Sequence, residues 1–255
     1  MITSPSNESV KHVTMLVKSA KARRKEGVFV VEGERIVREI PKEIVKECYV
    51  SEDYLSSHDG KDPGFDVTPI VVSSSVFKKM SDTSAPQGIL CVCRMRDTGV
   101  EEFLSTRQSG DLKLLILEGI QDPGNLGTMV RSAEGAGFDA IIADENTVDV
   151  YNPKVTRSTM GSLFRVPVFY TDDLPETVEK IKKMSVTVYA AHLKGSIAYR
   201  DVTYENRIAF LIGNEGSGLS DDISSKADRL IKIPMCGKLE SLNAAVAASL
   251  LMFGI

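Results

Sequence analysis

The sequence predicts an α/β protein in two parts: a larger C-terminal domain built on a parallel sheet and a smaller N-terminal α/β domain. From Lys113 onwards, short apolar runs alternate with helical segments, an order typical of a parallel sheet covered by helices on both faces. Residues 98–112 are polar and contain Gly99 and Gly110, which indicates a linker. A chain of 255 residues, 42% of them hydrophobic, is long enough to bury two cores.

The N-terminal domain is expected over residues 1–97 and contains both helical and strand patterns. The apolar residues of Val10–Lys25 have helical spacing, and Val28–Val31 is a short apolar run typical of a strand. A second helix is expected over 34–40 and ends before Pro41. Three further strands and one helix are expected at 48–50, 67–72, 89–93 and 73–80.

The C-terminal domain is expected over residues 113–255. The predicted strands are 114–117, 140–143, 166–170, 186–191, 208–212 and 230–233. The predicted helices are 125–136, 153–161, 174–183 and 241–253. In parallel sheets of this kind, ligands bind beyond the carboxyl ends of the strands, so the turns that follow these strands are where a site is expected.

Composition excludes several classes of protein. Disorder is excluded because the apolar content is ordinary for a globular protein, and no run is long and apolar enough to cross a membrane. The first residues lack the charged-then-apolar order of a signal peptide, so a cytoplasmic location is expected. Four cysteines do not make a disulfide scaffold, and Cys91 and Cys93 are expected as small core residues of a strand. The three histidines are not spaced with cysteines like a zinc site, so no metal is expected.

Charge is distributed unevenly along the chain. The total is 31 − 35 = −4, but residues 1–38 hold eight basic and four acidic side chains, a local balance of +4. Five basic residues occur with no acidic one between them at Lys18, Lys21, Arg23, Arg24 and Lys25. Such a run can neutralise phosphates even in an acidic protein, because nearby charges, and not the net charge of the whole protein, determine whether an anion is attracted. The alternative is a solvated helix face.

Three glycine-containing turns follow predicted strands, and the first is Glu118–Arg131. Pro123 and Gly124 turn the chain, and Asn125 is placed to cap the helix that follows. Arg131 lies about two turns into that helix. The residues favour equally a functional turn and ordinary turn chemistry with a surface arginine.

The second turn, Ile212–Ser220, contains Gly213, Gly216 and Gly218. Glycines allow the backbone to approach a ligand closely or to adopt positive φ. Glu215 in the middle would repel a phosphate, so a cationic or hydroxyl-rich ligand suits the loop better. The alternative is an ordinary strand-to-helix loop.

The third turn, Ile233–Ala247, leads into the last predicted helix. Ser241 can cap this helix, and Asn243 lies in its first turn. The small residues that follow allow close packing against another helix or a cofactor, and the alternative is a capped core helix.

A glycine pattern at Gly135–Ala140 fits a dinucleotide-binding fingerprint but lies in the wrong context. It follows a helix and precedes a strand, the reverse of the order that nicotinamide enzymes need. It is expected to be the glycine stop of the preceding helix. The hypothesis of a nicotinamide-dependent oxidoreductase therefore has no support in the sequence.

Taken together, these turns resemble the signatures of the SpoU (TrmH-like) family of RNA 2′-O-ribose methyltransferases, in the SPOUT class. The matching segments are Gly124–Ala133, Tyr151–Pro167, Leu211–Leu219, Ile233–Met235 and Ser241–Asn243. The N-terminal part is similar to the substrate-binding domain often fused to these enzymes, which resembles ribosomal proteins that bind RNA kinks. The segments that carry this second similarity are Ile2–Asn7, Lys11, Phe29–Gly33 and Ala85–Leu90.

The resemblance implies a fold, a cofactor and a reaction. The fold is a parallel-sheet α/β domain with a deep trefoil knot, which acts as a homodimer and binds S-adenosylmethionine in the knot. The reaction is 2′-O-ribose methylation of RNA, and the two-domain layout favours ribosomal RNA. The alternatives are an RNA-binding or ribosome-associated factor that has lost catalysis and a SPOUT enzyme that methylates a base of transfer RNA.

The resemblance also implies roles for individual residues. Arg131 acts at the ribose hydroxyl, where it clamps a phosphate and stabilises the developing alkoxide. It does not act as a base, because a guanidinium does not deprotonate. Asn125 orients Arg131 or the ribose, and Glu215 pairs with an arginine such as Arg131. Ser241 and Asn243 order the site beside the cofactor. The expected cofactor-binding residues are Leu193, Gly213, Asn214, Gly216, Ile233, Met235 and Leu242. The expected RNA-binding residues are Lys18, Lys21, Arg23, Arg24, Lys25 and Arg157.

Overall fold

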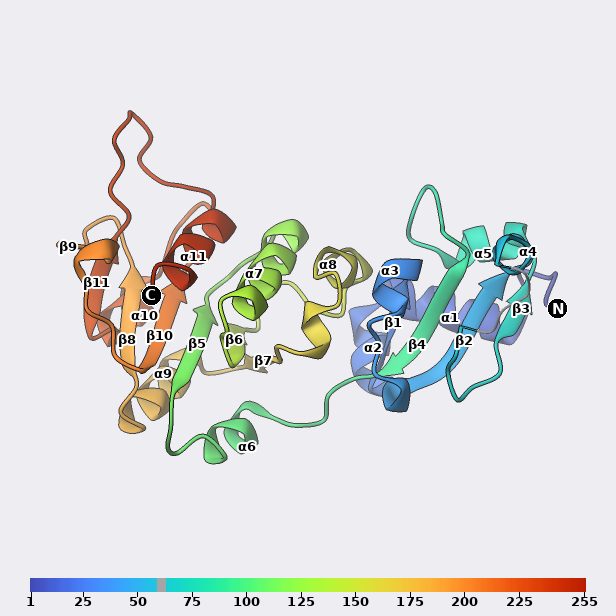
Figure 1. Ribbon diagram of the computed structural model, residues 1–255, viewed down its shortest axis with the longest axis horizontal. Helices are drawn as coiled ribbons and strands as arrows, with labels where there is room; N and C mark the ends of the chain where they lie inside the picture. The colour runs from blue at the N-terminus through green and yellow to red at the C-terminus, as the bar shows by residue number, and fades with distance from the viewer. Residues whose placement is uncertain (59–62) are drawn as a thin grey trace. The chain divides into compact units, whose positions relative to one another are not determined.

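The computed structural model of the chain describes residues 1–58 and 63–255. The described residues form two compact units. The first unit contains Met1–Asp97 together with Asp149–Phe164, and the second contains Thr98–Val148 together with Arg165–Ile255 (Figure 1). Nothing in the sequence indicated that Asp149–Phe164 would cluster with the N-terminal residues.

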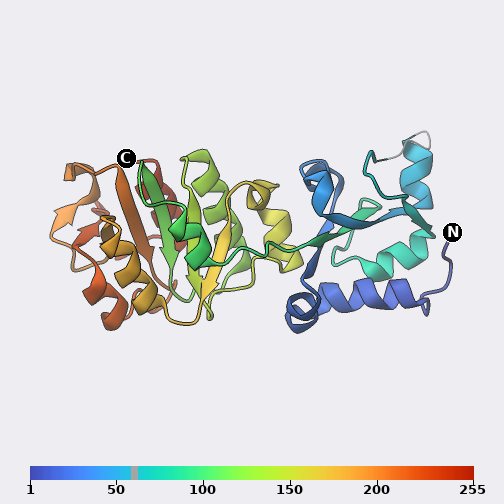
Figure 2. The ribbon, with the colours of Figure 1, turned by 90° about the horizontal axis from the view of Figure 1, so that it is seen from below.

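The first unit is built on a four-stranded mixed sheet. The strand order is β1-β4-β2-β3, in which only β2 and β3 are parallel. The strands are β1 (Val28–Glu32), β2 (Val45–Ser51), β3 (Ile70–Val72) and β4 (Ile89–Arg94). The helices are α1 (Glu8–Lys18), α2 (Ala20–Glu26), α3 (Glu34–Val37), α4 (Glu52–Ser57), α5 (Ser74–Met80) and α8 (Pro153–Ser158), with 3-10 turns at Lys42–Ile44 and Ser162–Phe164. Helices α1 and α5 lie beside each other on one face of this sheet and share its core (Figure 2).

The single helix predicted over Val10–Lys25 is two helices that meet at Ser19. The Ser19 backbone is extended, with φ −124° and ψ 108°. Its N–H donates to the Met15 carbonyl at the end of α1, while its hydroxyl accepts from the Ala22 N–H at the start of α2. A serine side chain that bonds to nearby backbone favours such a break over helix continuation.

Arg23, at the centre of the basic run, is buried and structural. The residue is 2% exposed, and its Nη1 donates to the Leu16 and Val17 carbonyls at 2.8 and 3.3 Å. Its Nη2 forms an ion pair with Asp149 Oδ2 at 2.6 Å. The guanidinium therefore satisfies carbonyls at the C-terminal end of α1, where a cation also complements the helix dipole. The prediction that Arg23 binds RNA is wrong, because the side chain is already enclosed by these partners.

The cysteine prediction is confirmed for the described strands. Cys48, Cys91 and Cys93 are fully buried in β2 and β4. Burial raises the pKa of the Cys93 thiol, so this group stays protonated as a small apolar residue of the core.

The second unit is built on a seven-stranded sheet, and every strand pair in it is parallel, as predicted. The order is β7-β6-β5-β10-β8-β11-β9. The strands are β5 (Leu112–Leu117), β6 (Ala140–Asp144), β7 (Val168–Thr171), β8 (Thr187–Ala191), β9 (Ile197–Ala198), β10 (Arg207–Ile212) and β11 (Arg229–Lys232), and a 3-10 turn covers Tyr199–Asp201. Strands β5, β6 and β10 are buried along almost their whole length, as expected for strands covered on both faces.

Helices cover both faces of this sheet. The helices are α6 (Val100–Ser105), α7 (Pro123–Gly135), α9 (Leu174–Lys183), α10 (Asp221–Lys226) and α11 (Ala244–Met252). Side chains of α6, α9 and α10 share one core with the sheet, while α7 and α11 pack against each other on the opposite face (Figure 1). Helix α6 lies within residues 98–112, the expected linker, and buries Val100, Phe103 and Leu104 in that core.

Two helix starts differ from the prediction by two or three residues. Helix α7 begins at Pro123 and is capped by Asp122, whose carboxylate accepts from the Asn125 N–H at 2.8 Å. Helix α11 is capped by Asn243, which accepts from the Ala245 N–H, and not by Ser241. Because Asp122 caps α7, the Asn125 side chain is not used as a cap and is available to other partners. The glycine stop of α7 is confirmed, since the helix ends at Gly135 and Gly137 takes a φ of +71°.

Over residues 1–58 and 63–255, no helix is long and apolar enough to cross a membrane. The trefoil knot implied by the resemblance stays a prediction, because strand order and pairing alone do not test it.

We predict that Arg23→Ala lowers the free energy of unfolding by about 3–5 kcal/mol, because it leaves the Asp149 carboxylate without its partner. Urea denaturation followed by circular dichroism measures this change. Lys21→Ala is the matched control, since Lys21 is an exposed cation of the same helix and its loss should cost less than about 0.5 kcal/mol. Equal, small losses in both variants would contradict a structural role for Arg23.

Candidate active site

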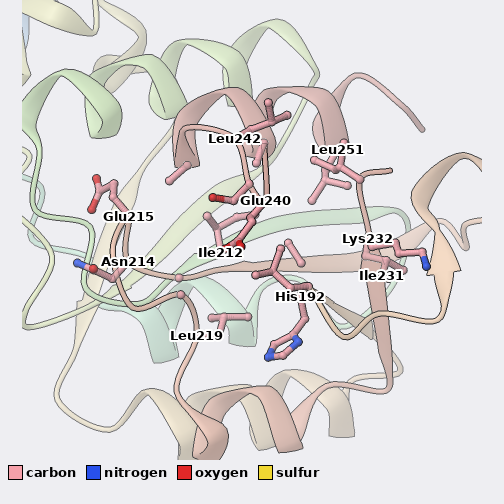
Figure 3. Close-up of a pocket in the computed structure, with 18 of the residues that line it drawn as sticks. His192, Ile212, Asn214, Glu215, Leu219, Ile231, Lys232, Glu240, Leu242 and Leu251 are labelled. Carbon is pink, nitrogen blue, oxygen red and sulfur yellow. The ribbon is translucent and has the colours of Figure 1, made fainter. Parts of the chain in front are cut away.

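The second unit contains a cavity of about 530 Å³ at the carboxyl ends of three neighbouring strands, β10, β8 and β11. Its walls are the residues that directly follow these strands, together with the start of α11 and the loop before it (Figure 3). The position agrees with the expectation that a ligand binds beyond the strand ends of a parallel sheet.

The loop after β10 is held in a tight turn by its own backbone. The N–H and carbonyl of Asn214 exchange hydrogen bonds with those of Gly218 at 3.1 and 2.9 Å. A Cβ on Gly213 would lie 2.2 Å from the Leu219 nitrogen, so only glycine fits there. The Asn214 amide donates to the Gly119 carbonyl at 2.7 Å, which ties this loop to the turn after β5. The loop therefore has a fixed shape and leaves the Glu215 side chain exposed.

The cavity has apolar walls and a polar rim. The apolar side chains include Ile212, Leu219, Leu242 and Leu251, and the polar ones include His192, Glu215, Lys232 and Glu240 (Figure 3). Aliphatic walls suit a flat aromatic ring, and carboxylates suit a hydroxyl-rich or cationic group while they repel a phosphate. The cavity thus favours the class of ligand that the glycine-rich turn indicated.

The structure brings together all the residues that the family resemblance assigned to the cofactor. These residues line the one cavity just described: Leu193, Gly213, Asn214, Gly216, Ile233, Met235 and Leu242. Leu193 is 69% exposed and lies at the rim.

A chain of side-chain hydrogen bonds joins three elements beside the cavity. Asn125 Nδ2 on α7 donates to Glu215 Oε1 at 2.8 Å. Asn243 Nδ2, at the start of α11, donates to Asn125 Oδ1 at 2.9 Å. The Asn243 Oδ1 atom is fixed in turn, because it caps α11. Asn125 thus stands between a carboxylate that lines the cavity and the cap of the last helix.

Arg131 is placed differently from the other predicted catalytic residues. It is exposed on α7 and is not among the residues that line the cavity. Glu215 bonds to Asn125 and not to Arg131, since six residues along a helix turn the two side chains toward different faces. Among the residues that the structure describes, no ion pair or side-chain hydrogen bond holds Arg131. Its guanidinium is therefore available to a ligand.

Several cavity residues were not predicted: His192, Lys232, Glu240 and Leu251. The first two lie at the carboxyl ends of β8 and β11, so the strand-end rule that indicated Gly213 would also have found them. Ser241 lines the cavity, and it does not cap α11 as predicted. In the described part of the chain, no cluster of three or more histidine, cysteine or acidic residues could hold a metal.

The predicted RNA-binding residues lie in the first unit and differ in exposure. Lys18, Lys21, Arg24 and Lys25 are exposed. Arg157 is partly buried and forms an ion pair with Asp82 at 2.9 Å, so a phosphate would compete with that carboxylate.

Comparison with known protein families supports both halves of this description. The family described as "SpoU rRNA Methylase family" matches residues 113–253. The family described as "MRM3-like substrate binding domain" matches residues 7–91.

Individual relatives match over almost the whole chain. A protein of Bacillus subtilis named 23S rRNA (guanosine(2553)-2′-O)-methyltransferase RlmP is 36% identical over 99% of this chain and 97% of its own. A putative TrmH family tRNA/rRNA methyltransferase of Staphylococcus aureus is 30% identical over 89% of this chain and 90% of its own. The crystal structure of an rRNA methyltransferase from Sinorhizobium meliloti superposes with a TM-score of 0.85, 27% identity and coverage of 99% and 95%. The chain therefore belongs to the SpoU rRNA methylase family, as its three turns indicated.

Proposed function

We propose that the protein transfers a methyl group from S-adenosylmethionine to a ribose 2′-hydroxyl of ribosomal RNA. The observation that carries this proposal is the convergence of three turns, separate in the sequence, on one cavity beside the Asn125–Glu215–Asn243 chain. The printed name of the Bacillus subtilis relative states a 2′-O-methyltransferase of 23S rRNA, and the identity extends over both units of this chain.

The cavity fits S-adenosylmethionine in size and chemistry. Its volume of about 530 Å³ lies within the range of pockets that hold small molecules. Leu242 and Ile212 offer apolar surface to an adenine ring, and Glu215 and Glu240 offer acceptors to ribose hydroxyls or to a cation. A relative from Sinorhizobium meliloti, 27% identical with a TM-score of 0.82, is described as an AdoMet-bound rRNA methyltransferase. When bound, the cofactor supplies an electrophilic methyl group on a sulfonium.

In this proposal Arg131 handles the RNA. A guanidinium can hold a phosphate through two hydrogen bonds and stabilise the oxygen as it loses its proton. It does not act as the base itself, because its pKa exceeds about 12. Exposure and the lack of a partner among the described residues leave Arg131 available for this contact.

Asn125 positions the ribose in this proposal, and its two partners hold it still. Glu215 fixes the Asn125 amide nitrogen, and the amide of Asn243 fixes its oxygen. A preorganised group of this kind does not have to be reoriented during the reaction, and positioning alone supplies up to about 7–11 kcal/mol of a barrier.

We further propose that the protein is a homodimer that acts in the cytoplasm, where a ribosomal RNA substrate would be met. Two large apolar side chains at α11 are exposed to solvent: Val246 on the helix and Phe253 at its C-cap, which are 47% and 62% exposed. They lie seven residues apart, and the Phe253 backbone continues the helical path, so the two side chains are expected on the same side of α11. An exposed apolar face of this kind is typical of a protein interface.

The proposed reaction is tested by the position of the methyl group. The protein is incubated with unmodified 23S rRNA transcript and S-adenosylmethionine labelled in the methyl group, and the RNA is digested to nucleosides. We expect the label on a ribose 2′-oxygen. A label on a base would show the alternative base methyltransferase, and cofactor binding without any transfer would show a factor that has lost catalysis.

We predict that Arg131→Ala lowers kcat by about 10²-fold or more, because it removes charge stabilisation at the hydroxyl. Cofactor affinity, measured by calorimetry, should stay within about twofold of the wild type, since Arg131 does not line the cavity. Arg35→Ala, which removes an exposed arginine of the first unit, is the control and should leave both values unchanged. An equal loss of binding and turnover in Arg131→Ala would remove it from the catalytic role.

We also predict that Gly213→Ala weakens cofactor binding by about tenfold or more. The added Cβ meets backbone atoms at 2.2 Å, so the loop after β10 must shift, at a cost of about 1–3 kcal/mol. Calorimetry measures the affinity, and circular dichroism shows that the variant is folded. Gly237→Ala is the matched control, because a Cβ there meets nothing within 4 Å. Unchanged affinity in a folded Gly213→Ala protein would argue against this loop as part of the cofactor site.

A further inference from the structure

The first unit contains a groove that no pattern in the sequence indicated. It has a volume of about 510 Å³ and lies along α1, with α5 at its side. The residues that line it are Pro5, Val10, Lys11, Thr14, Met15, Lys18 and Lys79. Of the predicted RNA-binding residues, only Lys18 is among them.

Helix periodicity places the lysines of α1 along one side of this groove. Lys11 and Lys18 are seven residues apart, so they lie on the same face of α1, about 10 Å apart along its axis. Lys79 comes from the last turn of α5, which packs beside α1. Two helices that are remote in the sequence therefore bring three cations to one groove.

The groove carries positive charge without compensation. Lys11, Lys18 and Lys79 are exposed, and no acidic residue lines the groove. None of the three forms an ion pair with another described residue, whereas lysines of the second unit such as Lys180 and Lys182 are paired. Three unpaired ammonium groups around one hollow set up a field that attracts a polyanion.

We propose that this groove binds the phosphate backbone of the substrate RNA. The inference rests on the proposed function and adds a binding site to it. Lysine is a flexible point charge that binds phosphates without demanding one geometry, which suits a backbone contact that carries no base recognition. An RNA backbone carries one negative charge per nucleotide, so two lysines about 10 Å apart along α1 can contact different phosphates of one strand.

The groove also offers apolar surface between the cations. Met15 lines the groove and is 42% exposed. A thioether makes favourable contacts with aromatic rings, so an unstacked base can rest on Met15 while the lysines hold the flanking phosphates. This combination of cations and a soft apolar platform favours RNA over an acidic peptide.

Lys18 links the groove to the basic run of α2. Lys21, Arg24 and Lys25 are exposed on that helix, which directly follows α1. The buried Arg23 contributes the ion pair that anchors the junction and no phosphate contact. The RNA site that the structure indicates therefore includes Lys11 and Lys79, which the charge run did not reveal, and excludes Arg23.

The test compares two triple variants of the full-length protein. The groove variant is Lys11→Gln, Lys18→Gln, Lys79→Gln. The control variant, Lys42→Gln, Lys46→Gln, Lys183→Gln, removes the same charge from three exposed lysines outside the groove. Unmodified 23S rRNA transcript is the probe, and filter binding gives Kd between 50 and 200 mM salt. Each phosphate contact contributes about 0.7–0.9 to the slope of log Kd against log salt, so the groove variant should lose about 2 from that slope.

Methyl transfer supplies a second readout. The groove variant should raise KM for RNA by about tenfold or more and leave kcat and cofactor affinity unchanged, and the control should match the wild type. A third variant, with arginine at the same three positions, keeps the charge and should restore most of the binding. That restoration separates loss of charge from a folding defect.

Two results would overturn the inference. If the groove variant binds RNA with the same Kd and salt slope as the control, the groove is not a phosphate site, even though methylation by the wild type would uphold the proposed function. If the wild type itself neither binds nor methylates the transcript, the proposed function fails and the groove proposal fails with it.

Discussion

The parallel pairing of β10, β8 and β11 is the constraint on which the site depends. Because all three strands run in the same direction, their carboxyl ends meet at one edge of the sheet. Residues near positions 191, 212 and 231, separate in the sequence, therefore open onto one cavity. The tight turn at Gly213 shapes one wall of this cavity, and the start of α11 shapes another.

A second constraint joins the cavity to the helices on the opposite face of the sheet from α9. Asn125 lies near the start of α7 and Asn243 caps α11, and these two helices pack against each other. A side-chain hydrogen bond between Ser132 and Ser249 further along the pair, at 2.7 Å, keeps them in register. The position of Asn125 relative to Glu215 is thus set by helix packing and not by a loop alone.

Apolar patterning predicted the strands of the second unit well, because buried parallel strands are short uninterrupted apolar runs. The same patterning also correctly placed the glycine-rich turns at the carboxyl ends of the strands. Helix starts were less certain, since Asp122 and Asn125 are both good capping residues and only the path of the chain decides between them. The burial of Arg23 could not be predicted, because its partner Asp149 is 126 residues away and the charge run alone resembles an exposed face. The groove of Lys11, Lys18 and Lys79 was missed for the same reason: it forms only when α5 packs beside α1.

We propose that the cavity beyond β10, β8 and β11 holds the methyl donor. A crystal structure of the protein with S-adenosylmethionine added tests it most directly. We expect electron density for the adenosine between Leu242 and the loop that starts at Gly213, with Arg131 not in contact with the cofactor. Density at any other position, or a cavity that stays empty while calorimetry records binding, would contradict it.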